Sequence, residues 1–507
     1  RRHTRYKDWS RGLGDVYKRQ LEARLAGGLS IDDAIIEVEN DDPENDDFST
    51  LVEVTDTTNW ANTPTFPGYS DGNVNGVVNV TVTDIWDPGN DVNYLYPSGG
   101  SDTTPPDVTI LSPVGGESWD ATTTQTVSWT ATDASGIAKI ELYLSDDGGL
   151  TFKQIADDLP NTGTHDQFIP NLPRSNIVFR VEAYDNAGNE GHDDRPAAFT
   201  INPVTYGVVP TTLRDFEMPG TQPFDGPVLD DPSEVCIACH GGYDTNVEHW
   251  HNWQGSMMAQ SQRDPLFMAT VAVAEQAVPA VGDLCLRCHT PGGWMEGRSL
   301  DTSGDMIVGK DLQGVQCDFC HKTVDPNYVA GVSPAKDLEV LNELDAIPVD
   351  AANGQFVVDA DPVQRGPYDD AAASHQFLDS AFHRSSDMCA TCHDVSNPAF
   401  VAGDAPGKYE VQALDTPHPD GDKRNMFPVE RTFSEWAESE YASTGVYAPQ
   451  FAGDKPDGIV STCQDCHMKD VTGVGCSEGG APTRSDLGLH DLTGANTFIP
   501  AVLAEFY

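Results

Sequence analysis

The sequence contains CIACH at residues 236–240, and the same pattern, CxxCH, returns four more times along the chain. The other copies are CLRCH at 285–289, CDFCH at 317–321, CATCH at 389–393 and CQDCH at 463–467. In each copy two cysteines stand three residues apart, and a histidine follows the second one directly. The five motifs, numbered 1 to 5 in chain order, use ten of the eleven cysteines and leave only Cys476.

This spacing indicates covalent haem attachment. Two thiols three residues apart can each add to one vinyl group of a haem, and the adjacent histidine then coordinates the iron. Zinc ribbons also use CxxC pairs, but zinc does not require a histidine directly after the second cysteine. We therefore predict five haem c groups held by Cys236, Cys239, Cys285, Cys288, Cys317, Cys320, Cys389, Cys392, Cys463 and Cys466. The predicted proximal iron ligands are His240, His289, His321, His393 and His467.

Each iron also needs a sixth ligand unless it binds substrate. The region from residue 203 onward has six spare histidines, and Met258 is a further candidate. These side chains are enough to provide one distal ligand for each of the five irons, which favours six-coordinate, electron-carrying haems. The candidates, in the order in which we rank them, are His490, His383, Met258, His375, His418, His251 and His249.

Other segments carry a resemblance to a known family. LHDLTGANTF at 489–498 resembles the distal-ligand segment H-[DR]-F-x-G-[GA]-N of multihaem cytochromes. WQGSMMAQSQRDPLF at 253–267 resembles W-x-x-S-x-H segments, with Met258 in place of the histidine. Together with CLRCHTPGGWMEGR, GVQCDFCH, FPVERTFSEW and CQDCHM, these make residues 230–507 similar to multihaem c-type cytochromes of the cytochrome-c-554-like superfamily. The resemblance implies a mainly α and irregular haem domain.

Residues 103–202 predict a different fold. Strand signals recur at Val108–Leu111, Thr126–Ala131, Ile137–Ser145, Thr151–Ile155, Ile177–Tyr184 and Ala197–Ile201. Apolar residues alternate within them, and Trp129 is the expected core aromatic. WTATD at 129–133 and AYDNAGNEG at 183–191 resemble bacterial immunoglobulin-like or fibronectin-III-like domains. The segment has no cysteine, so an inter-sheet disulfide is excluded.

The predicted fold class is therefore multidomain, an all-β immunoglobulin-like sandwich followed by a mainly α and irregular multihaem cytochrome c domain at 203–507. Residues 21–102 predict a β-rich segment of unknown family, with runs such as Val77–Val82. Residues 1–20 include SRGLGDVYKRQ at 10–20, which matches a translated sequencing-library adapter, so we exclude them from the fold. This interpretation implies that a signal peptide was lost with the true N-terminus, and truncation at the C-terminus stays open.

The composition and charge of the sequence limit its possible functions. The formal net charge of −51 opposes binding to nucleic acid and favours cationic partners. The sequence contains no run of about 18 apolar residues, so we predict no membrane-spanning helix. Haem attachment through CxxCH predicts a periplasmic or extracellular protein with redox protein partners. Electron transfer is the first hypothesis. The alternatives are a reductase of nitrite, hydroxylamine or a sulfur oxyanion with one open haem, and a subunit of an extracellular cytochrome filament. No motif ends in lysine, which weighs against the reductase.

Overall fold

The computed structural model describes residues 102–194, 197–203, 209–371, 373–478, 480–494, 496 and 498–506, together with five strands closer to the N-terminus. Residues 1–104 and 105–507 form two separate units. In the first unit, β1 (Ile35–Glu39) pairs with β2 (Ser49–Glu53). β4 (Val77–Val82) lies between β3 (Tyr69–Ser70) and β5 (Val92–Pro97), which confirms the strand predicted at 77–82. The adapter interpretation of residues 1–20 falls outside the described residues.

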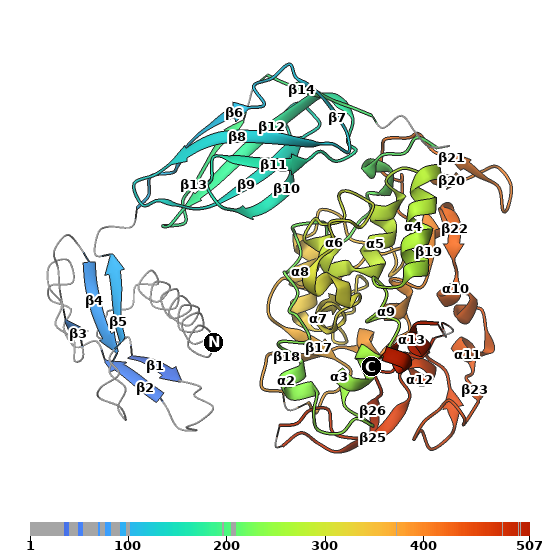
Figure 1. The fold of residues 1–507 in the computed structure, drawn as a ribbon. Helices are drawn as coiled ribbons and strands as arrows, with labels where there is room; N and C mark the ends of the chain where they lie inside the picture. Colours follow the sequence, from blue (N-terminus) through green and yellow to red (C-terminus); the bar gives the residue numbers. More distant parts are fainter. Residues whose placement is uncertain are drawn as a thin grey trace. The chain divides into compact units, whose positions relative to one another are not determined.

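The second unit begins with a β-sandwich (Figure 1). Its larger sheet has the strand order β10-β9-β12-β14-β7, with β13 also paired to β12, and its smaller sheet has the order β11-β8-β6. All neighbouring strands are antiparallel except β14 and β7. The strands are β6 (Asp107–Ser112), β7 (Ser118–Asp120), β8 (Thr124–Thr132), β9 (Ile137–Ser145), β10 (Lys153–Leu159), β11 (Thr164–Phe168), β12 (Arg174–Asp185), β13 (Glu190–Asp194) and β14 (Phe199–Asn202).

The core of the sandwich lies between the two sheets, as the alternation predicts. Ile140 and Leu142 of β9 are fully buried, and so are Phe179 and Val181 of β12. Trp129 of β8 is also buried, and its indole Nε1 donates a hydrogen bond to the side-chain oxygen of Asn161 at 3.0 Å. A buried indole needs such an acceptor, because its N–H would otherwise lose its water without replacement. Trp129 is therefore the core aromatic that the sequence predicted.

Residues from 203 onward form short helices joined by long irregular segments and two-stranded ribbons (Figure 1). The helices and 3-10 turns are η2 (Leu213–Phe216), α2 (Ile237–His240), α3 (His249–Gln254), α4 (Pro265–Ala277), α5 (Val281–His289), α6 (Pro291–Met295), η3 (Gly309–Gln313), α7 (Cys317–Lys322), α8 (Ala335–Glu343), η4 (Ala381–Arg384), α9 (Asp387–Ala390), η5 (Lys423–Asn425), α10 (Thr432–Ala437), α11 (Glu440–Ser443), α12 (Cys463–His467) and α13 (Phe498–Phe506).

Six ribbons complete this region, and all but β17–β18 are antiparallel. Their strands are β15 (Thr323–Val324), β16 (Val357–Val358), β17 (Gln364–Gly366), β18 (Phe377–Asp379), β19 (Val395–Asn397), β20 (Phe400–Ala402), β21 (Tyr409–Val411), β22 (Phe427–Glu430), β23 (Val446–Tyr447), β24 (Ile459–Val460), β25 (Asp470–Gly473) and β26 (Arg484–Gly488). Among the helices described for the chain, none combines the length and hydropathy of a membrane span.

Apolar side chains of this region gather in several small clusters, and three of them touch a motif. The cluster around Trp294 and Phe356 includes Phe319 of motif 3 and packs against Cys320. Leu286 of motif 2 belongs to a second cluster, and Cys466 of motif 5 packs against a third. Part of the apolar packing therefore lies against cysteines that are predicted to carry haem, namely Cys320, Cys285 and Cys466.

Candidate haem-binding site

Each CxxCH motif forms or ends a short helical turn. In motif 1 the backbone N–H of His240 donates to the carbonyl of Cys236 at 2.9 Å, and in motif 4 His393 donates to Cys389 at the same distance. Residues three and four apart on a helical turn lie on one face. The turn therefore directs two thiols and one imidazole to the same side, as one haem requires.

Backbone carbonyls hold four of the five motif histidines by Nδ1. The acceptors are the carbonyls of Gly475 for His240 (2.8 Å), Ser261 for His289 (3.4 Å), Arg365 for His321 (2.6 Å) and Thr493 for His467 (2.6 Å). A ring that donates from Nδ1 keeps Nε2 unprotonated and fixed in orientation, which is how proteins prepare a histidine for a metal.

Burial favours the neutral form of four motif rings, because it lowers the pKa of His240, His289, His321 and His393. A neutral imidazole offers a lone pair to a metal, whereas a protonated one does not. The thiol pairs, the anchored rings and their burial fit covalently attached haem.

Four of the predicted distal ligands gather around two motif histidines. Two imidazoles on opposite sides of one iron have ring centres roughly 6 Å apart, because each metal–nitrogen bond is about 2 Å long. The ring of His321 lies 6.1 Å from that of His383 and 6.3 Å from that of His490. The ring of His240 lies 5.6 Å from that of His249 and 6.5 Å from that of His375.

The nitrogen atoms distinguish His490 from His383. His490 donates from Nδ1 to the carbonyl of Gly488 at 2.9 Å, and burial lowers its pKa to about 4. It thus presents a neutral ring with Nε2 available, as four of the motif histidines do. His383 instead uses Nε2, which lies 2.9 Å from the carbonyl oxygen of Cys320.

The structure does not bring the other three candidates to a motif histidine in the same way. The Nδ1 atom of His418 lies 3.1 Å from a carboxylate oxygen of Asp420, and His251 is exposed at the end of α3. Met258 lies shortly before Ser261 in the chain, and the backbone carbonyl of Ser261 accepts a hydrogen bond from Nδ1 of His289. Among the described residues, no ring contact joins a spare histidine to His289, His393 or His467. Their distal ligands stay a prediction.

Thiols of different motifs influence one another's pKa. The thiol of Cys317 in motif 3 lowers the pKa of the Cys236 thiol in motif 1, and Cys236 raises that of Cys317. Cys288 of motif 2 and Cys392 of motif 4 are paired in the same way, and so are Cys389 of motif 4 and Cys463 of motif 5. The motifs of each pair therefore lie near one another.

Motif 4 is the centre of this arrangement. Cys320 of motif 3 is close enough to raise the pKa of both Cys389 and Cys392 through its charge. These influences pair motif 1 with motif 3 and motif 4 with motifs 2 and 5, and the link between motifs 3 and 4 is electrostatic only. No pattern in the sequence predicts that these cysteines lie near one another, because they are far apart in the chain.

A buried ion network fixes the carbonyl that anchors His321. The guanidinium of Arg365 is fully buried; its Nε donates to Asp337 at 2.9 Å, and its Nη2 donates to Asp359 at 2.6 Å. Arg365 thus neutralises two buried carboxylates while its own backbone carbonyl accepts the proton of His321 Nδ1. Sequence reasoning missed this residue, since it lies outside every motif.

We expect Arg365→Ala to destabilise the haem region by about 3–5 kcal/mol, because it leaves two buried carboxylates without a cation. Denaturant titration followed by haem absorption measures this loss. Lys336→Ala is the matched control, since it removes a more exposed pair with Asp361 at 2.6 Å and is expected to cost at most about 1 kcal/mol. Equal effects of the two substitutions would contradict the assignment.

The five CxxCH motifs with their anchored histidines, and the β-sandwich before them, are features expected of a multihaem c-type cytochrome with an added β domain. Residues 235–322, which span motifs 1 to 3, match the family described as cytochrome c554 and c-prime. Residues 106–165 match the family described as bacterial Ig domain. The chain thus contains a bacterial Ig-like domain and a cytochrome c554/c-prime domain, which confirms the predicted fold class. The exact limits of the predicted domains stay predictions.

Two further comparisons complete this result. A solved structure titled "Structures of Clostridium thermocellum CbhA fibronectin(III)-like modules" is 22% identical and aligns with 19% of this chain and 92% of its own, with a TM-score of 0.14. No curated protein matches the chain.

Proposed function

We propose that this protein transfers electrons between redox partners through five covalently attached c-type haems, outside the cytoplasm. The five CxxCH motifs, four of them with a histidine held through Nδ1 by a backbone carbonyl, carry this proposal. When bound, a c-type haem supplies one-electron redox chemistry at its iron. The cytochrome c554/c-prime domain supports multihaem electron transfer, whereas the number of haems and the location of the protein belong to the proposal.

The residues of this chain have distinct tasks in such a carrier. The ten motif cysteines would hold each haem by two thioether bonds, and the closeness of different motifs favours haems that lie near one another. The anchored Nδ1 atoms keep the proximal rings from turning. His490 and the other spare histidines near His321 and His240 would shield the irons of motifs 3 and 1 from small ligands.

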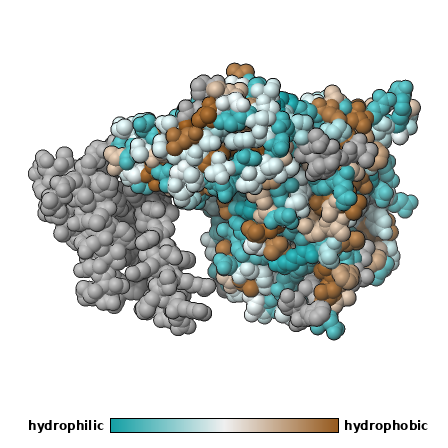
Figure 2. All heavy atoms as spheres, turned by 45° about the horizontal axis from the view of Figure 1, so that its top comes forward, coloured by the Kyte–Doolittle hydropathy of each residue, from teal (hydrophilic) through white to brown (hydrophobic). Residues whose placement is uncertain are grey.

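The surface suits a cationic redox partner. The formal net charge of −51 creates a negative field that attracts positively charged proteins and repels nucleic acid. On the face drawn in Figure 2, hydrophilic residues are widespread and the hydrophobic areas are small and separate. An encounter guided by charge at such a face would be brief and would weaken with added salt.

A reductive titration of the complete haem-loaded protein tests the proposal. We expect each chain to accept five electrons, one for each motif, and to return them to an oxidised partner without loss. Nitrite and hydroxylamine are expected to reoxidise the reduced protein without sustained turnover. A chain that accepts clearly fewer electrons, or that turns over either compound catalytically, would contradict an electron carrier with five haems.

One observation favours a second candidate function. Four spare histidines gather near His240 and His321, whereas in the described part of the chain none contacts His289, His393 or His467. An iron without a strong distal ligand can bind substrate, as a reductase requires. Carbon monoxide that binds the reduced protein stoichiometrically, together with turnover of nitrite, hydroxylamine or a sulfur oxyanion, would support this second candidate over the carrier.

A further inference from the structure

A group of metal-binding side chains lies on the sandwich, on the outer face of the larger sheet. Antiparallel pairing sets Glu182 of β12 opposite His192 of β13, and Tyr184 opposite Glu190. Directly opposed residues share a face, and so do residues two apart on one strand. Glu182, Glu190 and His192 therefore point to the same side, away from the core that buries Val181.

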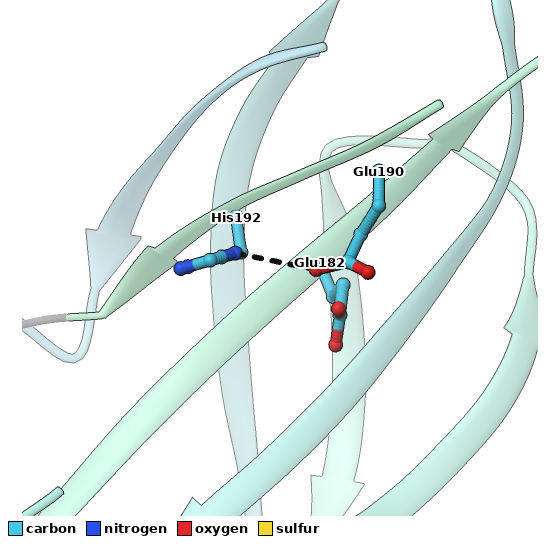
Figure 3. A group of neighbouring side chains, drawn as sticks. All are labelled: Glu182, Glu190 and His192. Carbon is cyan, nitrogen blue, oxygen red and sulfur yellow. Dashed lines mark ion pairs between the residues drawn. The ribbon is translucent and has the colours of Figure 1, made fainter. Parts of the chain in front are cut away.

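The donor atoms of these three residues converge (Figure 3). One oxygen of Glu182, one oxygen of Glu190 and one ring nitrogen of His192 all lie within 4.8 Å of one another. The Nδ1 atom of His192 is 3.4 Å from an oxygen of Glu190. The side chains of Glu190 and His192 are 47% and 43% exposed, so a cation can reach the group from solvent.

Glu182 has no ion-pair partner among the described residues. It is 5% exposed, and its carboxyl group shares a hydrogen bond with that of Glu190. The guanidinium of Arg180, whose charge reaches Glu182, makes its bidentate pair with Asp194. Among the described residues, no N–H group is hydrogen-bonded to the Glu182 carboxylate. Two adjoining carboxylates, one of them buried, are costly unless a shared proton or a bound cation neutralises them.

We propose that Glu182, Glu190 and His192 bind a divalent transition-metal cation of the Zn²⁺ type. Carboxylate oxygens and imidazole nitrogens are both zinc ligands, and a site with three protein ligands leaves the fourth position to water. An imidazole ligand favours Zn²⁺ over Ca²⁺ and Mg²⁺, which prefer oxygen alone. The site is independent of the haems, because all three ligands belong to the sandwich.

Zinc binding to the complete haem-loaded protein tests this inference. After equilibrium dialysis against Zn²⁺, the wild type is expected to retain one more zinc ion than His192→Ala or Glu190→Gln. Calorimetric titration should show that each substitution weakens this one site by at least about 100-fold. Both replaced residues are largely exposed, so the sandwich should keep its β-rich circular dichroism.

The control is His165→Ala, which removes the other described histidine of the sandwich, on β11 of the smaller sheet. It is expected to bind as much zinc as the wild type. Equal zinc contents of the wild type, His192→Ala and Glu190→Gln would overturn the site. If Ca²⁺ displaces the bound Zn²⁺ at equal concentration, the assignment to a transition metal is wrong. If one variant loses its β spectrum, Glu182→Gln replaces it, because this change conserves shape.

Discussion

Replacing both cysteines of motif 4 with alanine is expected to remove one haem and to interrupt electron exchange among the other four. Cys463 of motif 5 raises the pKa of Cys389, Cys288 of motif 2 raises that of Cys392, and the charge of Cys320 of motif 3 raises both. Without motif 4, motifs 1 and 3 still influence each other, but motifs 2 and 5 lose the neighbour with which their thiols interact. Rapid-mixing reduction with less than one equivalent of donor measures the exchange. We expect a resolved slow phase that the wild type lacks.

The matched control removes motif 1, which stands at one end of the series. Replacement of Cys236 and Cys239 with alanine also removes one haem, but motifs 3, 4, 2 and 5 stay connected. The four remaining haems should then exchange electrons as rapidly as in the wild type. Identical kinetics in the two double variants would show that the sulfur contacts do not define the route of the electrons.

The second large effect is expected from His490→Ala, which should convert one haem from low-spin to high-spin. His490 offers a neutral ring, anchored through Nδ1 to Gly488, and its ring lies nearly parallel to that of His321 with an interplanar angle of 16°. Its loss leaves the iron of motif 3 without a distal ligand, so carbon monoxide should bind one haem per reduced chain. Absorption and electron paramagnetic resonance spectra of the ferric and reduced states check this.

His383→Ala is the comparison for that prediction. One iron has a single distal position, and both His490 and His383 stand near His321. Because the Nε2 atom of His383 is bonded to the carbonyl of Cys320, we expect His383→Ala to stay low-spin. A high-spin haem in His383→Ala and none in His490→Ala would reverse the assignment of the ligand.

Local patterns in the sequence predicted those parts of the fold in which apolar alternation is strong. The run expected at Ile137–Ser145 is β9 with the same limits, and Ile177–Tyr184 lies within β12. Three short strands, β7, β11 and β13, were not predicted. Their sequences, SWD, THDQF and EGHDD, contain few apolar residues. They take strand form because a neighbouring strand supplies hydrogen-bond partners, and this information is not local.

In the candidate site, too, local sequence patterns predicted some features, whereas features that depend on distant residues were missed. The CxxCH motifs could be read from the sequence because one haem is held by five consecutive residues. Distal ligands could be counted but not assigned, since His490 and the nearby His321 are separated by 168 residues of the chain. The anchoring carbonyls of Gly475, Ser261 and Thr493 leave no trace in the sequence, because every residue has a carbonyl. The metal-binding group on β12 and β13 was likewise missed, as β13 itself was not predicted.

The central claim is that each of the five CxxCH motifs carries one covalent haem. The mass of the complete protein, matured in a host that attaches haem c and then denatured, tests it most directly. The account predicts a mass increase of five haem groups and no free thiol in the ten motif cysteines. A fully matured protein that carries four haems or fewer, or that holds zinc on free motif thiols, would contradict it.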